Sequence, residues 1–449
     1  MKKGNILLVV ILVLIAGVIV GLSFLMAPPS KEKVGGQTPP ASTPGGSVAP
    51  DSTKPPAHGF SSQSPVVGPA TEKAGLPVRG TQAGDTLLET TFEKGLNWLL
   101  SQQRPDGAWA NFPEMGNTPD VAFTSFPVII IAEAPARYRQ AYQTKIDKSI
   151  QYILSKQREN GSFIDSEVPP VMVIYKTSLA IVALATWDKE KYKDQIFKGR
   201  TYLEKSQFGP EDGSDQTGGW GYQEKPDKEP AKNANMSTTS YAIWAAHLAE
   251  LPKDSEVYKN AVEFITKCQS YSETNKYRAA TGNDGGLYYA PNQSKVEPQE
   301  TDTLPDGTKI LRSYASMTYS GLLSMIYAFI DKNDPRVQAA YRWIKEHYTL
   351  DKNIGMVNTQ DKPRADKEGL YYYYHTFAKA LDAYGEETLI TLPDNQTHYW
   401  SKDLVAKLAA VQKPEGLWIN DADRWGENYA PLPTSYALMS LNICRQWVK

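Results

Sequence analysis

The sequence predicts an all-α protein whose main part is a closed ring of six helical hairpins, preceded by one transmembrane helix and a disordered linker. Three observations predict this organisation: a short pattern that recurs six times, an uncharged apolar run near the start, and a stretch rich in Pro, Gly and Ser between them. We expect the anchor at residues 1–27, the linker at 28–84 and the ring at 85–449.

The apolar run near the start predicts a membrane anchor. Lys2 and Lys3 precede an uncharged run from Ile6 to Met26, which as a helix is long enough to cross a bilayer. A cleaved signal peptide is the alternative, but its apolar region normally has only about 7 to 15 residues and ends at a small-residue site. No Ala-x-Ala pattern precedes Pro28. We therefore expect a single-pass membrane protein whose ring lies outside the cytoplasm.

The linker has few large apolar residues, as in PPSKEKVGGQTPPASTPGGS. Such a segment cannot bury enough surface to offset its ordering entropy, so we expect a partly extended tether. A spacer that holds the ring away from the membrane and a connector without a function of its own both fit this composition.

Composition excludes two classes of function. The formal net charge is −2 and supplies no basic stripe, so we expect no nucleic-acid partner. Cys268 and Cys444 are the only cysteines, which excludes a disulfide framework or a cysteine-based zinc cluster. The chain is instead rich in aromatic residues, with 26 Tyr and 10 Trp.

The repeat is an apolar helix end, usually a Gln, a polar turn, a Gly and in most copies an aromatic residue. It occurs at WLLSQQRPDGAW (98–109), YILSKQRENGSF (152–163) and LAAVQKPEGLWI (408–419), and in degenerate form at 202–222, 264–289 and 343–356. A second apolar helix follows each copy and shares a threonine near its start: Thr124, Thr177, Thr239, Thr318, Thr376 and Thr434. Six hairpins, and so twelve helices, are predicted.

The size of the repeat region and its last unit favour a closed ring. One simple core supports roughly 250 to 300 residues, but hairpins packed side by side escape that limit because each buries its own faces. An open solenoid needs polar caps at its ends, yet the last unit is still apolar in LMSLNIC (438–444). We therefore expect the last unit to close on the first around a central cavity.

The Gln, Gly and aromatic pattern followed by a Thr-headed helix resembles the repeats of the squalene cyclase and protein prenyltransferase superfamily. The resemblance covers residues 85–449 and implies an (α/α)6 toroid. It also implies that the repeated side chains tie each turn to neighbouring helices and are scaffold: Gln103, Trp109, Gln157, Phe163, Gln207, Gln269, Gln412 and Trp418.

The catalytic motifs of that superfamily are missing. Triterpene cyclases carry their acid in Asp-x-Asp-Asp-Thr-Ala or Asp-Cys-Thr-Ala-Glu, and neither string occurs here. His375 in YYYYHTFAKAL stands at the zinc-ligand position of prenyltransferases, but Arg312 and Tyr314 occupy the Asp and Cys positions. Because a catalytic zinc needs three protein ligands, we expect no metal and no cofactor. The thioester-bearing toroids of complement-like proteins are excluded too, since Gly-Cys-Gly-Glu-Gln is absent.

Three residues are weak catalytic candidates. His375 fits a structural, hydrogen-bonded histidine or a catalytic one, and no acid is visible beside it. Asp421 and Asp423 lie in the loop that leaves the sixth turn, where a solvated loop or a helix cap is expected and a substrate or Ca²⁺ contact is the alternative.

Aromatic residues near the helix heads predict an aromatic cavity. Four consecutive residues of a helix point in four directions, so the tyrosines of GLYYYYHTF cannot all face one pocket. The candidates for the cavity lining are Trp220, Tyr222, Trp244, Tyr314, Tyr319, Tyr371, Tyr374 and Trp425. An isoprenoid or other lipid is the expected ligand, with catalysis left open. The alternatives are an active cyclase with a non-standard acid and a glycan-binding or carbohydrate-active α/α barrel.

Overall fold

The computed structural model describes residues 83–165, 172–225, 230, 232–277 and 281–448. The predicted anchor at 1–27 and all but the last two residues of the predicted linker lie outside this part of the chain. Among the helices that are described, none combines the length and apolar character of a membrane span.

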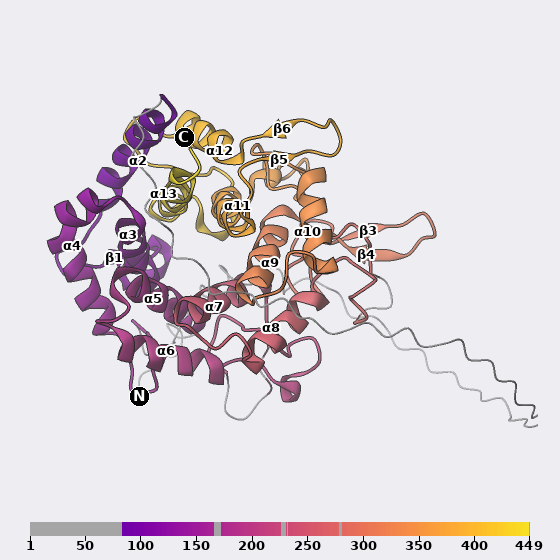
Figure 1. The fold of residues 1–449 in the computed structure, drawn as a ribbon, viewed down its shortest axis with the longest axis horizontal. Helices are drawn as coiled ribbons and strands as arrows, with labels where there is room; N and C mark the ends of the chain where they lie inside the picture. The colour runs from indigo at the N-terminus through magenta and orange to yellow at the C-terminus, as the bar shows by residue number, and fades with distance from the viewer. Residues whose placement is uncertain (1–82, 166–171, 226–229, 231, 278–280, 449) are drawn as a thin grey trace, which may run out of the picture. The chain divides into compact units, whose positions relative to one another are not determined.

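The described chain alternates between outer and inner helices, as the repeat predicts (Figure 1). The outer helices are α2 (Ala83–Ser101), α4 (Ala136–Leu154), α6 (Lys193–Lys205), α8 (Glu256–Lys267), α10 (Pro335–Glu346) and α12 (Trp400–Val411). The inner helices are α3 (Val121–Glu133), α5 (Val173–Asp188), α7 (Met236–Leu248), α9 (Ala315–Tyr327), α11 (Leu370–Tyr384) and α13 (Pro431–Arg445).

The inner helices form a closed ring. Each packs against the next, and α13 packs against α3 (Figure 1). The outer layer closes as well, because α12 contacts α2. Across the seam, Asn442 Nδ2 donates to Ile130 O at 2.8 Å and Gln412 Nε2 donates to Thr91 O at 2.9 Å. The predicted closure of the last unit on the first is confirmed.

Burial separates the two layers. Inner helix α7 is buried at nearly every position from Met236 to Ala246, since it meets neighbours on all sides. Outer helix α8 buries one face only, with Tyr258, Val262 and Ile265 on it. The sequences follow this difference: inner helices are apolar all round and outer helices are amphipathic.

A glutamine ties each of five turns to the next outer helix. Gln103 Nε2 donates to Gly107 O at 3.1 Å, in its own turn, and to Lys145 O at 2.9 Å, on α4. Equivalent pairs of hydrogen bonds are made by Gln157, Gln207, Gln269 and Gln412. The turn must contain glycine because the chains touch: a Cβ on Gly161, at φ +96°, would lie 2.2 Å from Lys198 O.

The shared threonines tie the same turns to the inner helices. Trp109 N donates to Thr124 Oγ1 at 3.0 Å, and the same bond recurs in four other units, at Thr177, Thr239, Thr318 and Thr434. The indole of Trp109 also donates to Leu99 O at 2.9 Å, and that of Trp418 to Leu408 O at 2.9 Å. These contacts confirm the scaffold role predicted for the repeated Gln and aromatic residues.

The fifth turn is held by tyrosines. Tyr348 stands at the glutamine position, two residues after the end of α10, and its Oη donates to Asp403 Oδ2 on α12 at 2.8 Å. Tyr373 Oη donates to Thr349 O and Tyr374 Oη donates to Leu350 O, both at 2.6 Å. Tyr348 therefore makes the tie to the next outer helix, and two of the four consecutive tyrosines of α11 hold the turn to the inner helix.

Short strands lie in the loops between the helices. They pair antiparallel as β1 (Trp109–Ala110) with β2 (Pro119–Asp120), β3 (Thr301–Thr303) with β4 (Lys309–Leu311), and β5 (Leu389–Ile390) with β6 (Thr397–His398). Cys268 and Cys444 are both buried and unpaired.

Candidate ligand-binding site at the heads of the inner helices

Aromatic rings meet across the centre of the toroid. Six residues from α5, α7, α11 and α13, here called the aromatic plug, are Tyr175, Tyr241, Trp244, Tyr372, His375 and Tyr436. Ring centroids of Tyr241 lie 4.6 Å from Tyr175 and 6.4 Å from Tyr372. Tyr436 lies 5.8 Å from Tyr372 and stacks on His375 at 5.6 Å. The interior is therefore packed at this level, and an open central cavity does not run through the plug.

A recess lies on the side of the plug where the inner helices begin, here called the head end. Tyr222, Tyr289 and Tyr372 are partly exposed there. Burial nevertheless raises the pKa of Tyr289 well above its usual range and that of Tyr372 to about 12. These tyrosines therefore meet solvent on one side and packed protein on the other. We call these three residues and Tyr314, which is 1% exposed beside them, the tyrosine recess.

Backbone hydrogen bonds hold the recess against the helix heads. Ile174 N, in the first turn of α5, donates to Tyr222 O at 3.2 Å, and Met236 N, the first residue of α7, donates to Tyr289 O at 2.8 Å. Tyr314 is the residue before α9, and the hydroxyl of Tyr372 lies 3.1 Å from Ser320 Oγ on α9. Each tyrosine is thus fixed by a different helix start.

Charges of both signs surround the recess. Arg424 reaches Glu368 at 2.8 Å and Glu297 at 3.3 Å. Lys295 Nζ lies 5.5 Å from the ring centroid of Tyr289, and burial lowers the pKa of this lysine. Glu300 accepts from Lys295 N at 3.2 Å. The described residues around the recess therefore include both cations and carboxylates.

Trp425 stands on the same rim in an unusual conformation. Its backbone is left-handed, with φ 61°, which is rare for a bulky residue, and its side chain is 38% exposed. Arg424 lies over the indole ring at 4.3 Å. Gly369 leaves room for this indole, since a Cβ at position 369 would lie only 2.9 Å from it.

A buried carboxyl group fixes the start of α11. Glu427 is 1% exposed and accepts from Tyr372 N at 2.8 Å, Tyr371 N at 3.2 Å and Asn420 Nδ2 at 2.8 Å. Burial raises the pKa of Glu427 to about 7. With its oxygens engaged by the helix start and Asn420, this residue is a helix cap.

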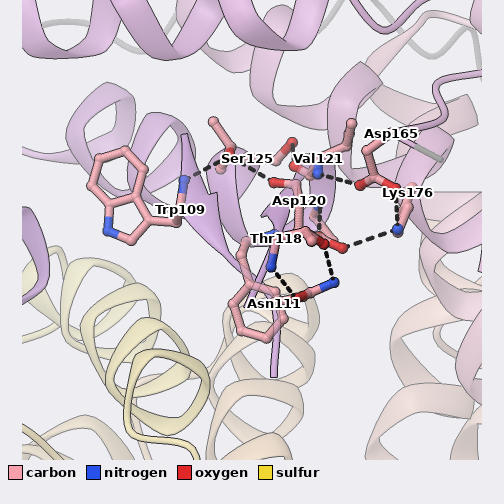
Figure 2. Close-up of polar contacts among 11 residues, drawn as sticks. Trp109, Asn111, Thr118, Asp120, Val121, Ser125, Asp165 and Lys176 are labelled. Carbon is pink, nitrogen blue, oxygen red and sulfur yellow. Dashed lines mark hydrogen bonds and ion pairs between the residues drawn. The ribbon is translucent and has the colours of Figure 1, made fainter. Parts of the chain in front are cut away.

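A second buried ionic group joins the first two hairpins (Figure 2). Lys176 Nζ lies 2.6 Å from Asp165 and 2.9 Å from Asp120, whose other oxygen caps α3 through Ala122 N. Asp165 also accepts from Val121 N at 2.8 Å. Burial opposes the charge of Lys176, but the two carboxylates outweigh it and raise the pKa of the lysine. Burial raises the pKa of Asp120. This group is a clamp between α3 and α5.

The predicted lining residues are spread over several environments. Tyr222 and Tyr314 lie in the recess, Trp244 in the plug and Trp425 on the rim. Trp220 is a scaffold residue whose indole donates to Leu203 O. Tyr319, Tyr371 and Tyr374 pack among neighbouring aromatic rings of α11, as in the contact of Tyr319 with Phe377 at 5.2 Å.

The three catalytic candidates do not come together with an acid–base partner. His375 is buried in the plug, its Nδ1 has no hydrogen-bond partner, and burial lowers its pKa well below the usual range. Asp421 is exposed and pairs with Arg364 at 2.5 Å, and Asp423 is an exposed loop residue. Among the residues that the structure describes, no three His, Cys, Asp or Glu side chains are grouped to hold a metal ion.

Sequence comparisons match only part of the chain, whereas solved structures match most of it. A family model described as the A-macroglobulin TED domain matches residues 81–208. That stretch contains neither cysteine of the chain, in line with the absence of a thioester motif. No curated protein matches the chain.

Among solved structures, a type II terpene cyclase, MstE from Scytonema, in complex with merosterolic acid A is 12% identical with a TM-score of 0.50, covering 81% of this chain and 99% of the other. The GH76A alpha-1,6-mannanase of Salegentibacter sp. HEL1_6 is 11% identical with a TM-score of 0.50, covering 82% and 100%. An inactive variant of this mannanase in complex with alpha-1,6-mannotriose gives the same score.

The chain has a terpene-cyclase-like α/α toroid fold. At such low identity the likeness concerns the fold alone, and one fold hosts both of these chemistries. The function of this toroid has to be argued from its own side chains.

Several residues of the toroid's interior were not predicted from the sequence. Tyr241 and Tyr436 of the plug stand two residues after shared threonines, as do Phe126 and Ser320, so this position of the repeat faces the ring centre. Asp120 stands four residues before Thr124, and Lys176 directly before Thr177. Their fixed distances from the shared threonines are the sequence signal that marks these positions.

A cavity of about 340 Å³ lies beside the hairpin of β3 and β4, and its lining includes none of the four recess tyrosines. Its lining includes Asp284, Trp343 and His347, together with Arg312, which is bound to Asp302. Of His375, Arg312 and Tyr314, which stand at the zinc-ligand positions of prenyltransferases, only Arg312 lines this cavity.

Proposed function

We propose that the toroid is a binding module that takes a glycan into the tyrosine recess and carries out no chemistry on it. The observation that supports this most is the group of partly exposed tyrosines, Tyr222, Tyr289 and Tyr372, at one end of the ring. Sugar rings present C–H faces that pack on aromatic rings and hydroxyls that pair with phenol groups.

The depth of the recess favours a polar ligand over a long hydrocarbon chain. The plug fills the ring centre, so an isoprenoid would have to displace the contacts of Tyr241 with Tyr175 and Tyr372. It would also leave tyrosine hydroxyls without partners, which costs free energy in an apolar environment. A glycan supplies those partners.

The engaged state of the carboxylates supports binding without hydrolysis. Glycoside hydrolysis normally requires two carboxyl groups that face the scissile bond. Glu297 and Glu368 hold Arg424, and Glu427 caps α11. The described carboxylates nearest the recess therefore support its walls.

An isoprenoid or other lipid is the second candidate, and a phenylalanine cluster favours it. Phe112 and Phe123 lie 5.2 Å apart at the head of α3, and both contact Tyr429, at 5.4 and 5.5 Å. Phe112 is partly exposed. The proposed anchor at residues 1–27 would keep the toroid near the membrane, outside the cytoplasm, and an apolar surface suits ligands drawn from it.

A binding screen separates the two ligand classes. The protein is applied to an array of oligosaccharides and, in parallel, incubated with a total lipid extract that is re-extracted for mass spectrometry. The proposal expects a defined oligosaccharide and no stoichiometric lipid. Tyr289→Ala should weaken glycan binding at least tenfold, whereas Tyr277→Ala, an exposed tyrosine elsewhere, should leave it unchanged. A stoichiometric lipid would overturn the glycan proposal, as would equal binding by both variants.

A further inference from the structure

Lys379 is a buried lysine inside the toroid. It lies on α11 one turn after His375, beyond the plug, and is 7% exposed. Its Nζ lies 3.3 Å from the ring centroid of Trp244 and 5.7 Å from that of Tyr327. The aromatic faces stabilise the cation, but less than water or paired carboxylates would.

Most of the groups near Lys379 lie at the C-terminal ends of the inner helices, here called the tail end. They are Glu133 on α3, His247 on α7, Tyr327 on α9, and His375 and Asp382 on α11. Burial lowers the pKa of Lys379 to about 8, although Glu133 and Asp382 act in the opposite direction. Asp382 accepts from Trp447 Nε1 at 2.9 Å and Gln446 Nε2 at 2.5 Å.

Solvent reaches the neighbourhood of this lysine. Glu133 is exposed, yet the surrounding protein raises the pKa of its carboxyl group. The exposed carboxyl group of Glu133 meets water at the tail end, and Lys379 itself keeps 7% of its surface exposed. Lys379 thus combines a weakly stabilised ammonium group with a route to solvent through the tail end.

Lys176 provides a contrast within the same chain. It is as deeply buried, at 4%, but two carboxylates lie within 2.9 Å of its Nζ and raise its pKa. Lys176 therefore stays protonated and cannot act as a nucleophile. Burial alone does not make a lysine reactive, and the difference lies in the ion pairs.

We propose that Lys379 is a reactive amine that forms an imine with a small aldehyde entering from the tail end. In this step the neutral amine nitrogen attacks the carbonyl carbon, and a proton moves from nitrogen to oxygen to give a carbinolamine. Glu133 protonates the hydroxyl group, water leaves, and the nitrogen lone pair forms the C=N bond. The carboxylate then recovers the second amine proton, so one water is released and no oxidant is needed. This proposal is independent of the glycan proposal.

The expected selectivity is large. Only roughly 0.1% of an ordinary lysine is unprotonated at pH 7.5. Because burial lowers the pKa of Lys379, its unprotonated fraction at this pH is much larger. Lower intrinsic nucleophilicity and restricted access reduce this advantage, so we expect at least tenfold faster labelling than at exposed lysines.

The test is reductive labelling of the full chain with propionaldehyde and cyanoborohydride at pH 7.5, stopped at low conversion and mapped by peptide mass spectrometry. We expect Lys379 to be labelled at least tenfold faster than exposed lysines such as Lys259, and Lys176 to remain unlabelled. Between pH 7 and 10, the rate at Lys379 should level off near pH 9 while that at exposed lysines still rises. Lys379→Arg, which keeps the charge and should preserve the fold by circular dichroism, should remove this signal.

Labelling of Lys379 no faster than that of exposed lysines would overturn the proposal. A pH profile for Lys379 that follows the exposed lysines would overturn it as well. Neither result depends on whether a glycan or a lipid occupies the head end.

Discussion

Glu427 links the charge state of one residue to the stability of the head end. Burial raises its pKa to about 7 in the folded protein, from an ordinary value of 4.5. The folded state therefore binds this proton more tightly than the unfolded state, so the contribution of Glu427 to stability is present below pH 4.5 and is lost as the pH rises through 7. The shift corresponds to about 3 kcal/mol between these limits.

We predict that Glu427→Gln removes this pH dependence. Between pH 5 and pH 8 the free energy of unfolding of the wild type should fall by up to about 3 kcal/mol more than that of the variant. Urea denaturation at both pH values measures the difference. If both proteins lose the same stability over this range, Glu427 is ionised in the folded state and the assigned pKa is wrong.

The glutamine of the first turn gives a second prediction for a single residue. Gln103→Met deprives Gly107 O and Lys145 O of their donor, which should cost about 1–3 kcal/mol of unfolding free energy. Gln102→Met is the matched control, because this neighbouring side chain is exposed and should change stability by less than about 0.5 kcal/mol. Equal effects of the two substitutions in denaturant titrations would show that the tie is not what stabilises the turn.

At the scale of single residues, the sequence predicted the scaffold better than the interior. The repeated Gln, Gly and Thr residues act within one hairpin or between neighbours, so their pattern recurs locally and is visible in most of the six copies. The plug depends on contacts between distant units, such as the hydroxyls of Tyr175 and Tyr436, which lie 3.4 Å apart across 261 positions of the chain. A local pattern carries no information on which rings meet at the centre.

Pairs of helices are joined by the clamp of Asp120, Lys176 and Asp165, which connects the heads of α3 and α5 (Figure 2). Removing the cation leaves two buried carboxylates without their partner. Lys176→Met should therefore destabilise the protein by about 3–5 kcal/mol, measured by chemical denaturation.

Lys189→Met is the control for the clamp. Lys189 pairs with Glu250 at 2.7 Å, but Glu250 is largely exposed, so this loss should cost less than about 1 kcal/mol. Similar losses for Lys176→Met and Lys189→Met would mean that the buried group is hydrated and contributes no more than a surface pair.

The fifth turn shows why elements were predicted unevenly. The helices could be placed because apolar periodicity and the shared threonines mark every inner helix. The tie of the fifth turn could not be assigned, since a tyrosine, Tyr348, makes it in place of the glutamine, while Tyr373 and Tyr374 add bonds from α11. The same substitution explains the run of four tyrosines: two hold the turn, Tyr372 enters the ring centre and Tyr371 packs on Tyr374 at 5.6 Å.

At the scale of the whole molecule, closure of the ring gives the first and last helices neighbours on both sides, as every other helix has. In an open array the terminal repeats lose contacts on one side and open at lower free energy. Here α13 packs against α3, and α2 packs against α12 and α13. Closure could be predicted from the apolar last unit, whereas the filling of the centre could not, because it depends on all six units at once.

We predict that native-state hydrogen exchange will show this closure. Amides in the middle of α2 and α13 should have protection factors within about tenfold of those in α7, which lies far from both ends of the helix order. Strong protection in α7 with rapid exchange throughout α2 and α13 would indicate an open array and contradict the closed ring.

The central claim is that the toroid binds a glycan at its head end, above a filled centre. Photoaffinity labelling with two diazirine probes, one on a short oligosaccharide selected by the array and one on a polyprenyl alcohol, tests it most directly. We expect the sugar probe to label peptides that contain Tyr222, Tyr289 and Tyr372, in competition with unlabelled sugar, and the polyprenyl probe to label none of them specifically. Specific head-end labelling by the polyprenyl probe, or sugar labelling confined to other surfaces, would contradict the claim.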